Sequence, residues 1–357
     1  MRYPMGIMFL LLLLNMRAQE PALIGYYAGD GSRLSEHHVE YLTHLIWCFA
    51  HVVDDSMHIA PEQYKVIRGM VDLKARNPRL KVLLSMGGWG GCANCSAVFS
   101  REEGRSRFAK SVKHQLEITG TDGIDLDWEY PAVQGPPGHA FSDADRRNFT
   151  LLLTELRKEL GNRYEVTFAA GGTDECLLRG FEWNEVIPLM DRVHLMSYDL
   201  HHGYSTSTGH HTALYSTAEQ TLSAQHSVDL LIGQGVPRSK IVIGSAFYSR
   251  IWKQVPPDNN GLHRTGTFSH SVSYHSMDSL IPPSFGWRFH IDREASASYA
   301  YNAAEKLFIT FDDPMSVAAK AGYVRRERLG GIMFWQLADD RPVDGLLDAM
   351  YRALRTR

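Results

Sequence analysis

The sequence predicts an α/β protein built on a (β/α)8 TIM barrel, and three observations support this fold class. Eight short apolar or β-branched segments alternate with segments of helical periodicity along the chain. A length of 357 residues suits one such barrel with an insertion. Polar and glycine-containing motifs follow several predicted strands, and this fold gathers such motifs on one face.

The predicted strands are short apolar runs that end in turn residues. They are Leu23–Tyr27, Leu45–Phe49, Val82–Met86, Gly123–Asp127, Glu165–Ala170, Val193–Tyr198, Ile241–Phe247 and Gly331–Gln336. Helical periodicity is clearest in Ser106–Ile118, Asp143–Leu160, Thr217–Gln234 and Met315–Arg328. Asp313 and Pro314 favour the start of the last helix, as its N-cap and its first-turn proline.

One stretch interrupts this alternation after the seventh predicted strand. Between Tyr248 and about Thr310 the apolar pattern fits no strand–helix unit, and aromatic residues and prolines are mixed. We therefore expect a small α+β insertion domain over residues 250–310, within a barrel that spans residues 20–357. Internal repeats, low-complexity linkers and a separate binding module are not evident in the sequence.

The N-terminus has the pattern of a signal peptide over residues 1–19. Arg2 supplies a positive charge, Gly6–Leu14 is apolar, and Ala18 is a small residue at a plausible cleavage point. The apolar run is too short to span a membrane. We expect export to the extracellular space or the periplasm, and no membrane partner.

Charge and cysteine content argue against several other functions. The net charge is −3 and no basic stripe is present, so no nucleic-acid partner is expected, and we expect a monomer. Cys48 lies in an apolar run and is expected to be buried. Cys92 and Cys95 form a C-x-x-C motif, for which a local disulfide and two free thiols are equal alternatives. A second ligand pair for zinc is missing, so no metal site is expected there.

Three acids at alternate positions make Asp122–Pro131 the most informative segment. Asp125, Asp127 and Glu129 share one face of an extended strand, whereas Asp122 has the opposite parity and is expected to be a support residue. Stacked carboxylates repel one another, so at least one holds a proton near neutral pH. A proton held beside a carboxylate is what acid-assisted cleavage of a glycosidic bond requires.

Two other interpretations of these acids fit poorly. The intervening Ile124, Leu126 and Trp128 are apolar, which a solvated acidic face would not require. A calcium loop of the EF-hand type needs a different ligand spacing and a glutamate further along the chain. The pattern therefore favours acid catalysis inside a barrel.

Four motifs in order along the chain resemble glycoside hydrolase family 18, the chitinases. Asp122–Glu129 matches the family signature D-x-x-D-x-D-x-E at every defined position. Ser85–Trp89 resembles the S-x-G-G segment and Met196–Asp199 the M-x-Y-D segment. Gly331–Trp335 resembles the eighth strand, which ends in tryptophan. The resemblance runs from about Leu23 to the C-terminus and is of the bacterial type with an insertion domain.

The resemblance implies a secreted chitinase that hydrolyses β-1,4 linkages between N-acetylglucosamine units without a metal or cofactor. In this family the acetamido oxygen of the sugar at subsite −1 attacks its own anomeric carbon, and an oxazolinium intermediate forms. Glu129 would protonate the leaving oxygen, and Asp127 would orient the acetamido N–H. Asp125 would share a proton with Asp127, and Tyr198 would donate its hydroxyl to the attacking oxygen.

The resemblance also implies residues that bind chitin or a chito-oligosaccharide. Trp335 would form the floor of subsite −1, and Asp199 would bond the sugar. The other expected substrate-binding residues are Tyr130, Trp89, Met196, Tyr26, Phe49, Gly88, Arg250 and Trp252. For Trp89, Tyr130 and Trp252, packing in the core or at the rim is an equal alternative.

Several residues near these motifs are expected to be structural. Ser85 and Gly87 are small and leave room for the carboxylates, and Ser85 could bond Asp122 or Asp125. Four histidines after the M-x-Y-D segment suggest a metal, but no acid or cysteine completes a site and this chemistry needs none. They are His201, His202, His210 and His211.

Two alternatives share the predicted fold. An endo-β-N-acetylglucosaminidase acting on N-glycans has the same acid motif, but the Trp335 strand and the insertion favour a chitinase, because the insertion deepens a groove for a linear chain. A non-catalytic chitin-binding lectin typically lacks the acid. Glu129, Asp127 and Tyr198 are all present, which favours an enzyme.

Overall fold

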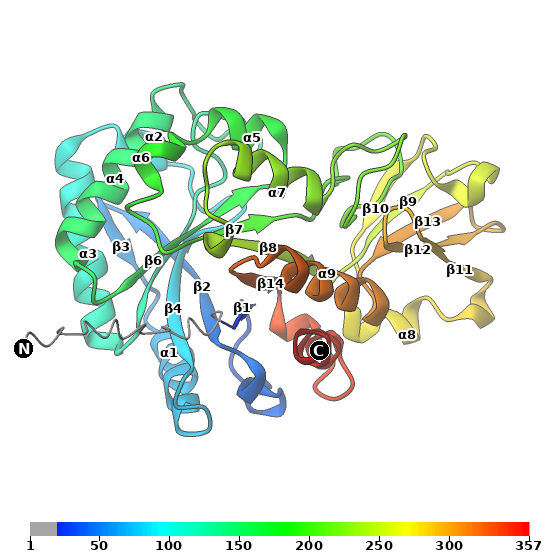
Figure 1. The fold of residues 1–357 in the computed structure, drawn as a ribbon, viewed down its shortest axis with the longest axis horizontal. Helices are drawn as coiled ribbons and strands as arrows, with labels where there is room; N and C mark the ends of the chain where they lie inside the picture. Colours follow the sequence, from blue (N-terminus) through cyan, green and yellow to red (C-terminus); the bar gives the residue numbers. More distant parts are fainter. Residues whose placement is uncertain (1–19, 357) are drawn as a thin grey trace, which may run out of the picture.

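The computed structural model describes residues 20–356, and its core is a closed parallel barrel with helices outside it (Figure 1). The expected signal peptide, residues 1–19, lies outside the described residues. The barrel strands are β1 (Ala22–Tyr27), β2 (His44–Val53), β4 (Lys81–Gly87), β5 (Gly123–Asp127), β6 (Glu165–Gly171), β7 (Arg192–Met196), β8 (Ile241–Ala246) and β14 (Gly331–Trp335). Because β1 pairs with both β2 and β14, the sheet closes, and the predicted eight-stranded barrel is confirmed.

Helices cover the outer surface of the barrel strands (Figure 1). They are α1 (Gln63–Asp72), α2 (Cys95–Phe99), α3 (Glu102–Thr119), α4 (Asp145–Leu160), α5 (Asp174–Arg179), α6 (Trp183–Val186), α7 (Ala224–Gly233), α9 (Pro314–Glu327) and α10 (Leu346–Arg355). None of the helices within residues 20–356 combines the length and the apolar character that crossing a membrane requires.

Side-chain caps set the starts of α7 and α9. Asp313 caps α9 as predicted, since its carboxylate accepts a hydrogen bond from the Ser316 backbone N–H at 2.8 Å. The predicted start of α7 at Thr217 was wrong, and the helix begins at Ala224. Ser223 is its cap, because its Oγ accepts a hydrogen bond from the backbone N–H three residues later at 3.1 Å.

Alternation along the strands divides the apolar side chains into two cores. One cluster fills the barrel axis and consists of Ala22, Ile24, Tyr26, Ile46, Cys48, Leu83, Ala169, Met196, Val242 and Met333. Residues of the opposite parity pack between strands and helices in a larger cluster that includes Trp47 and Leu126. Since strand parity decides the face, Asp125 and Asp127 lie on the inner face while Leu126 points to the helices.

A small antiparallel sheet follows β8 and lies beside the barrel (Figure 1). Its strands are β9 (Arg250–Lys253), β10 (Thr267–His270), β11 (Trp287–Asp292), β12 (Ala297–Asn302) and β13 (Leu307–Phe311), in the order β10-β9-β13-β12-β11. A short helix, α8 (Met277–Leu280), lies between β10 and β11 in sequence. The expected insertion is therefore an antiparallel sheet with a minor helical part.

A buried ion pair joins the end of this sheet to the barrel. Lys320 Nζ on α9 lies 2.6 Å from Asp312 Oδ2, and both side chains are 0% exposed. Asp312 follows β13 and also accepts hydrogen bonds from the Ala246 backbone N–H at 3.0 Å and from Thr212 Oγ1 at 3.0 Å. These contacts hold the end of β13 against the carboxyl end of β8.

Candidate active site

The alternate acids run along β5 and past its end toward the carboxyl face of the barrel. The residue exposure rises from 0% at Asp125 to 4% at Asp127 and 9% at Glu129. The three acids are thus ordered from the barrel interior to its mouth. Limited access to water favours the neutral form of a carboxyl group, so this site can retain protons.

Asp127 and Glu129 both bind protons more tightly than ordinary carboxyl groups. Burial, followed by the charges of Glu129 and Asp125, raises the pKa of Asp127 well above its usual value. Burial also raises the pKa of Glu129, to about 7. A glutamic acid with this pKa can donate a proton near neutral pH, which is the property a general acid needs.

Asp125 is the most extensively hydrogen-bonded of the three acids. Its Oδ2 accepts hydrogen bonds from Tyr26 Oη and from Ser85 Oγ, each at 3.0 Å. Its Oδ1 accepts one from Thr167 Oγ1 at 2.6 Å and lies 3.2 Å from His194 Nδ1. Burial alone would raise the pKa of Asp125, but these partners outweigh it and lower the pKa. Ser85 was expected to bond Asp122 or Asp125, and in the structure it contacts Asp125.

Asp125 and Asp127, which we expected to share a proton, have pKa shifts of opposite direction. The lowered pKa of Asp125 and the raised pKa of Asp127 favour Asp127 as the acid that binds the proton of the pair more tightly. The Oδ1 atom of Asp127 is buried and has no hydrogen-bond partner among the described residues. Asp127 therefore has an oxygen free to bind an incoming polar group.

Tyr198 lies just after the end of β7, and Trp335 is the last residue of β14. Both therefore lie at the carboxyl face of the barrel. The Tyr198 hydroxyl lies 4.0 Å from Met333 Sδ, a weak acceptor, and keeps its capacity to donate to a ligand. Burial raises the pKa of Tyr198 well above its usual value, so the hydroxyl stays protonated. Trp335 is half-buried and stacks on Phe49, with ring centroids 5.5 Å apart and planes 14° apart. Its centroid lies 6.0 Å from that of Tyr26, which lies deeper in the barrel.

The two glycines at the end of β4 make room for these groups. Gly87 and Gly88 have φ angles of 115° and 80°, which favour glycine. A Cβ atom at Gly87 would collide with the Asp127 carbonyl oxygen, and one at Gly88 would collide with the Phe49 ring. The Gly88 backbone N–H also donates to the Asp127 carbonyl at 2.9 Å. Gly87 thus allows β4 to approach the acidic strand closely, and Gly88 leaves room for the Phe49 ring on β2.

Asp199 and Arg250 close one side of the site. The Asp199 carboxylate accepts hydrogen bonds from Arg250 Nε at 2.7 Å and Nη2 at 2.6 Å, and it lies 3.6 Å from His211 Nδ1. Burial opposes ionisation of Asp199, but these partners lower its pKa far below the usual value. The guanidinium also lies over the Tyr248 ring, 5.2 Å from its centroid. Both predicted binding residues are therefore engaged with each other.

The remaining predicted sugar contacts lie in different surroundings. Trp89 is 54% exposed on the loop after β4, where it can act as a rim residue. Met196 and Tyr130 pack against the barrel-axis cluster. The expected sugar contact of Trp252 is wrong, since this residue is 0% exposed in the core of the insertion sheet and its indole donates to the Ser205 carbonyl at 3.0 Å.

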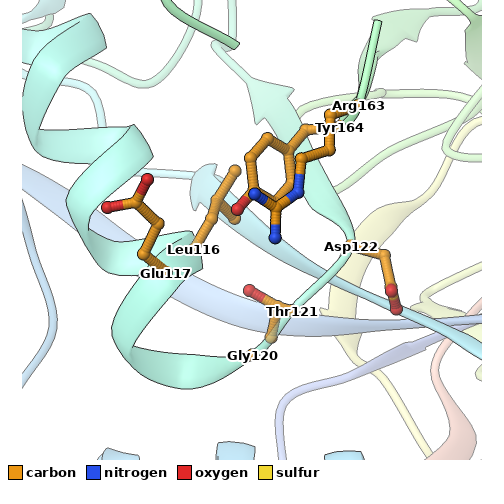
Figure 2. Close-up of a pocket in the computed structure, with 7 residues that line it drawn as sticks. All are labelled: Leu116, Glu117, Gly120, Thr121, Asp122, Arg163 and Tyr164. Carbon is orange, nitrogen blue, oxygen red and sulfur yellow. The ribbon is translucent and has the colours of Figure 1, made fainter.

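Asp122 lies at the other end of β5 and supports the barrel. Its carboxylate is 2.7 Å from Lys74 Nζ and accepts a hydrogen bond from the Val82 backbone N–H at 2.7 Å. A surface pocket beside it is lined by Leu116, Glu117, Gly120, Thr121, Asp122, Arg163 and Tyr164 (Figure 2). This pocket lies at the amino end of β5, whereas the three acids extend to the carboxyl end, so it is separate from the candidate active site.

The four cysteines and His210 lie in buried positions. Cys48, Cys92, Cys95 and Cys176 are buried free thiols, so the C-x-x-C motif has no disulfide in this structure. His210 Nε2 lies 3.0 Å from Asp292 Oδ2 in the insertion sheet. Within residues 20–356, no group of three histidine, cysteine or acidic side chains is placed to hold a metal ion.

Two residues of the Asp125 network were missed from the sequence. Thr167 is the residue paired with Asp125 in the register between β5 and β6. His194 lies on the inner face of β7, two residues before Met196. Strand parity could have placed His194 inside the barrel, because residues two positions apart on a strand, such as His194 and Met196, point to the same face.

Comparisons with known proteins agree with this site. The model of glycosyl hydrolases family 18 matches residues 22–340. Chitinase A1 from Niallia circulans is 31% identical over 293 residues, which cover 75% of this chain and 42% of that protein. Chitotriosidase-1 from Mus musculus is 29% identical over 316 residues, which cover 83% of this chain and 66% of that protein. The chain thus spans less than two thirds of either relative's length.

Solved structures extend this similarity to three dimensions. A glycoside hydrolase family 18 N-acetylglucosaminidase from Paenibacillus barengoltzii has a TM-score of 0.86 and 37% identity, covering 93% of this chain and 99% of that one. Chitinase ChiW from Paenibacillus sp. str. FPU-7 has a TM-score of 0.87 and 30% identity, covering 94% of this chain and 43% of that one. From the family match over residues 22–340 and the three acids on and beyond β5, the chain belongs to glycosyl hydrolases family 18.

Proposed function

We propose that this protein hydrolyses β-1,4 linkages between N-acetylglucosamine units in chitin or chito-oligosaccharides, using the acetamido group of the substrate as nucleophile. The supporting observation is the pair formed by Asp127 and Tyr198. Asp127 is buried and Tyr198 is half-buried, and the pKa of each is raised well above its usual value. Each has a polar atom without a strong hydrogen-bond partner among the described residues. The signal-like residues 1–19 suit a protein exported toward an extracellular polymer.

Glu129 serves as the general acid in this proposal. Its proton passes to the glycosidic oxygen as the acetamido oxygen bonds to the anomeric carbon and the bond to the leaving sugar breaks. The pKa of about 7 keeps Glu129 protonated below neutral pH. The resulting carboxylate then takes a proton from the water that opens the oxazolinium ring. Two successive displacements at the anomeric carbon retain its configuration.

Asp127 and Tyr198 hold the acetamido group during the attack. The free Oδ1 atom of Asp127 can accept the acetamido N–H, and the Tyr198 hydroxyl can donate to the attacking oxygen. Fixing the nucleophile beside the anomeric carbon makes the attack intramolecular, which is worth several powers of ten in rate. The Trp335 ring offers an apolar face for stacking against the sugar.

A second candidate is an N-acetylglucosaminidase that releases single sugars from a chain end. It is supported by the Paenibacillus barengoltzii enzyme, which is 37% identical and matched over 99% of its length. A third, an endo-β-N-acetylglucosaminidase on N-glycans, needs the same acids. The insertion sheet beside the barrel favours chitin, because a wall along the site suits a linear chain.

Hydrolysis of N-acetylglucosamine oligomers of three to six units tests this proposal. Products are identified by mass spectrometry, with the Glu129→Gln variant as the matched control. Dimers released by the wild type, and lost in the variant, would support a chitinase, whereas single sugars as the only product would indicate the N-acetylglucosaminidase. Release of N-glycans from a glycoprotein without oligomer cleavage would indicate the third activity. Binding without any cleavage would refute the hydrolase proposal and leave a lectin.

A further inference from the structure

His194 is a buried polar residue beside the acids that the proposed reaction does not use. It lies on β7 and is 1% exposed. Its Nδ1 atom is 3.2 Å from Asp125 Oδ1 and 2.8 Å from Tyr26 Oη. The ring thus contacts both the innermost acid and a tyrosine that hydrogen-bonds the same acid.

The surroundings of Asp125 leave little room for a proton on its carboxylate. Tyr26 and Ser85 donate to Oδ2, while Thr167 donates to Oδ1 and His194 lies within reach of the same oxygen. An ionised carboxylate offers about four lone-pair sites, and four neighbours can fill them. A proton on Asp125 would therefore displace one of these donors.

The orientation of the imidazole identifies the nitrogen that donates. Nδ1 faces Asp125 and Tyr26, whereas Nε2 is buried without a hydrogen-bond partner among the described residues. A proton on Nε2 would lie in the barrel interior with no acceptor, which costs free energy. With a proton on Nδ1, the ring avoids this cost and donates toward Tyr26 Oη at 2.8 Å and Asp125 Oδ1 at 3.2 Å.

We propose that His194 is a positioning residue whose Nδ1–H keeps Asp125 ionised, so that the proton of the pair stays on Asp127. The inference rests on the proposed hydrolysis, in which Asp127 holds the acetamido group. The lowered pKa of Asp125 and the raised pKa of Asp127 agree with it.

Other titratable groups near His194 are held by their own partners. His44 Nε2 lies 3.0 Å from Glu165 Oε2, and the same oxygen lies 2.9 Å from Arg192 Nη1. Lys81 contacts the second oxygen of the same glutamate. The titratable groups that face His194 are Tyr26 on β1 and Asp125 on β5, and His44 on β2 is also close to it.

The pH dependence of kcat and KM for oligomer hydrolysis tests this role in three proteins. His194→Asn keeps an amide donor close to the position of Nδ1, whereas His194→Leu keeps the volume without a donor. A hydrogen bond to a charged group is worth about 10- to 100-fold. We expect His194→Leu to lower kcat by about that factor with little change in KM. The acid limb of its profile should move toward neutral pH, because Asp125 then takes up a proton more readily.

His194→Asn should stay close to the wild type in both kcat and the acid limb. Superimposable wild-type and His194→Leu profiles, or equal losses in the two variants, would overturn the proposal. If His194→Leu does not fold, nitrogen NMR of the wild-type histidines decides, with His194→Asn used for assignment. A proton on Nδ1 of His194 is expected, and a proton on Nε2 alone would overturn the proposal. Absence of hydrolysis by the wild type would instead refute the proposed function. The NMR measurement would still show which nitrogen of His194 carries the proton.

Discussion

Asp199 and Arg250 form a two-pronged ion pair that connects the barrel to the insertion sheet. Arg250 Nε and Nη2 lie 2.7 and 2.6 Å from the two carboxylate oxygens of Asp199. Asp199 is the neighbour of Tyr198 in sequence, and Arg250 is the first residue of β9. The insertion sheet therefore helps to fix the backbone that presents the Tyr198 hydroxyl to the site.

Loss of this ion pair should impair catalysis. Arg250→Met keeps an apolar stem but leaves the Asp199 carboxylate without its main partner, and we expect kcat/KM on oligomers to fall by about 10- to 100-fold. Arg288 on the exposed side of β11 is the matched control, and Arg288→Met should be close to the wild type. Equal kinetics of Arg250→Met and the control would show that the ion pair does not position Tyr198.

The pKa of Glu129 predicts the alkaline limb of the pH profile. The reaction needs protonated Glu129, so kcat/KM should be highest well below its pKa of about 7 and should decline as the pH rises through this value. Each further pH unit should lower the rate about tenfold. Measurements between pH 4 and 9 test this, and activity that keeps rising up to pH 9 would contradict the assignment of the acid.

The Tyr198 hydroxyl is predicted to act mainly in the transition state. Tyr198→Phe should lower kcat by about 10- to 100-fold with a smaller effect on KM, because the hydrogen bond strengthens as the acetamido oxygen attacks. Tyr204 is 64% exposed, and Tyr204→Phe should change kcat little. The two variants are compared by steady-state kinetics after circular dichroism has established that both are folded. A Tyr198→Phe enzyme with wild-type kcat would remove this residue from the mechanism.

The buried pair of Lys320 and Asp312 is predicted to be a determinant of stability. Lys320→Met leaves the Asp312 carboxylate buried without its cation, which should lower the free energy of unfolding by about 3 to 5 kcal/mol. Urea denaturation measures the loss. Adding Asp312→Asn removes the unpaired charge and should restore part of the stability. If the Lys320→Met protein is as stable as the wild type, another group compensates the charge of Asp312.

Much of the barrel could be predicted because its signals are local. The strand Gly123–Asp127 was predicted with its observed bounds, since alternating acids and apolar residues mark both of its faces. The helices α1 and α10 were not predicted, and neither Glu62 nor Gly345 before them is one of the strong side-chain caps. Caps alone did not decide the outcome, because α3 and α4 were predicted from their apolar periodicity although Arg101 and Ala144 before them provide no side-chain cap.

The site was predictable where its residues lie in motifs and not where it depends on partners far apart in sequence. The acids, Tyr198 and Trp335 belong to contiguous motifs, and the fold brings them to one face. His194 contacts an acid 69 positions earlier, and Trp252 is covered by Phe268 and Phe308 of neighbouring strands. Such contacts depend on strand register, which a single sequence does not specify.

The most direct test of the central claim is the anomeric configuration of the first product. Proton NMR follows hydrolysis of an N-acetylglucosamine oligomer at times shorter than mutarotation, with Glu129→Gln as the control. Substrate-assisted cleavage predicts that the new reducing end appears as the β-anomer and that the variant forms almost none. Initial formation of the α-anomer would contradict the proposed mechanism, because it requires direct attack of water with inversion.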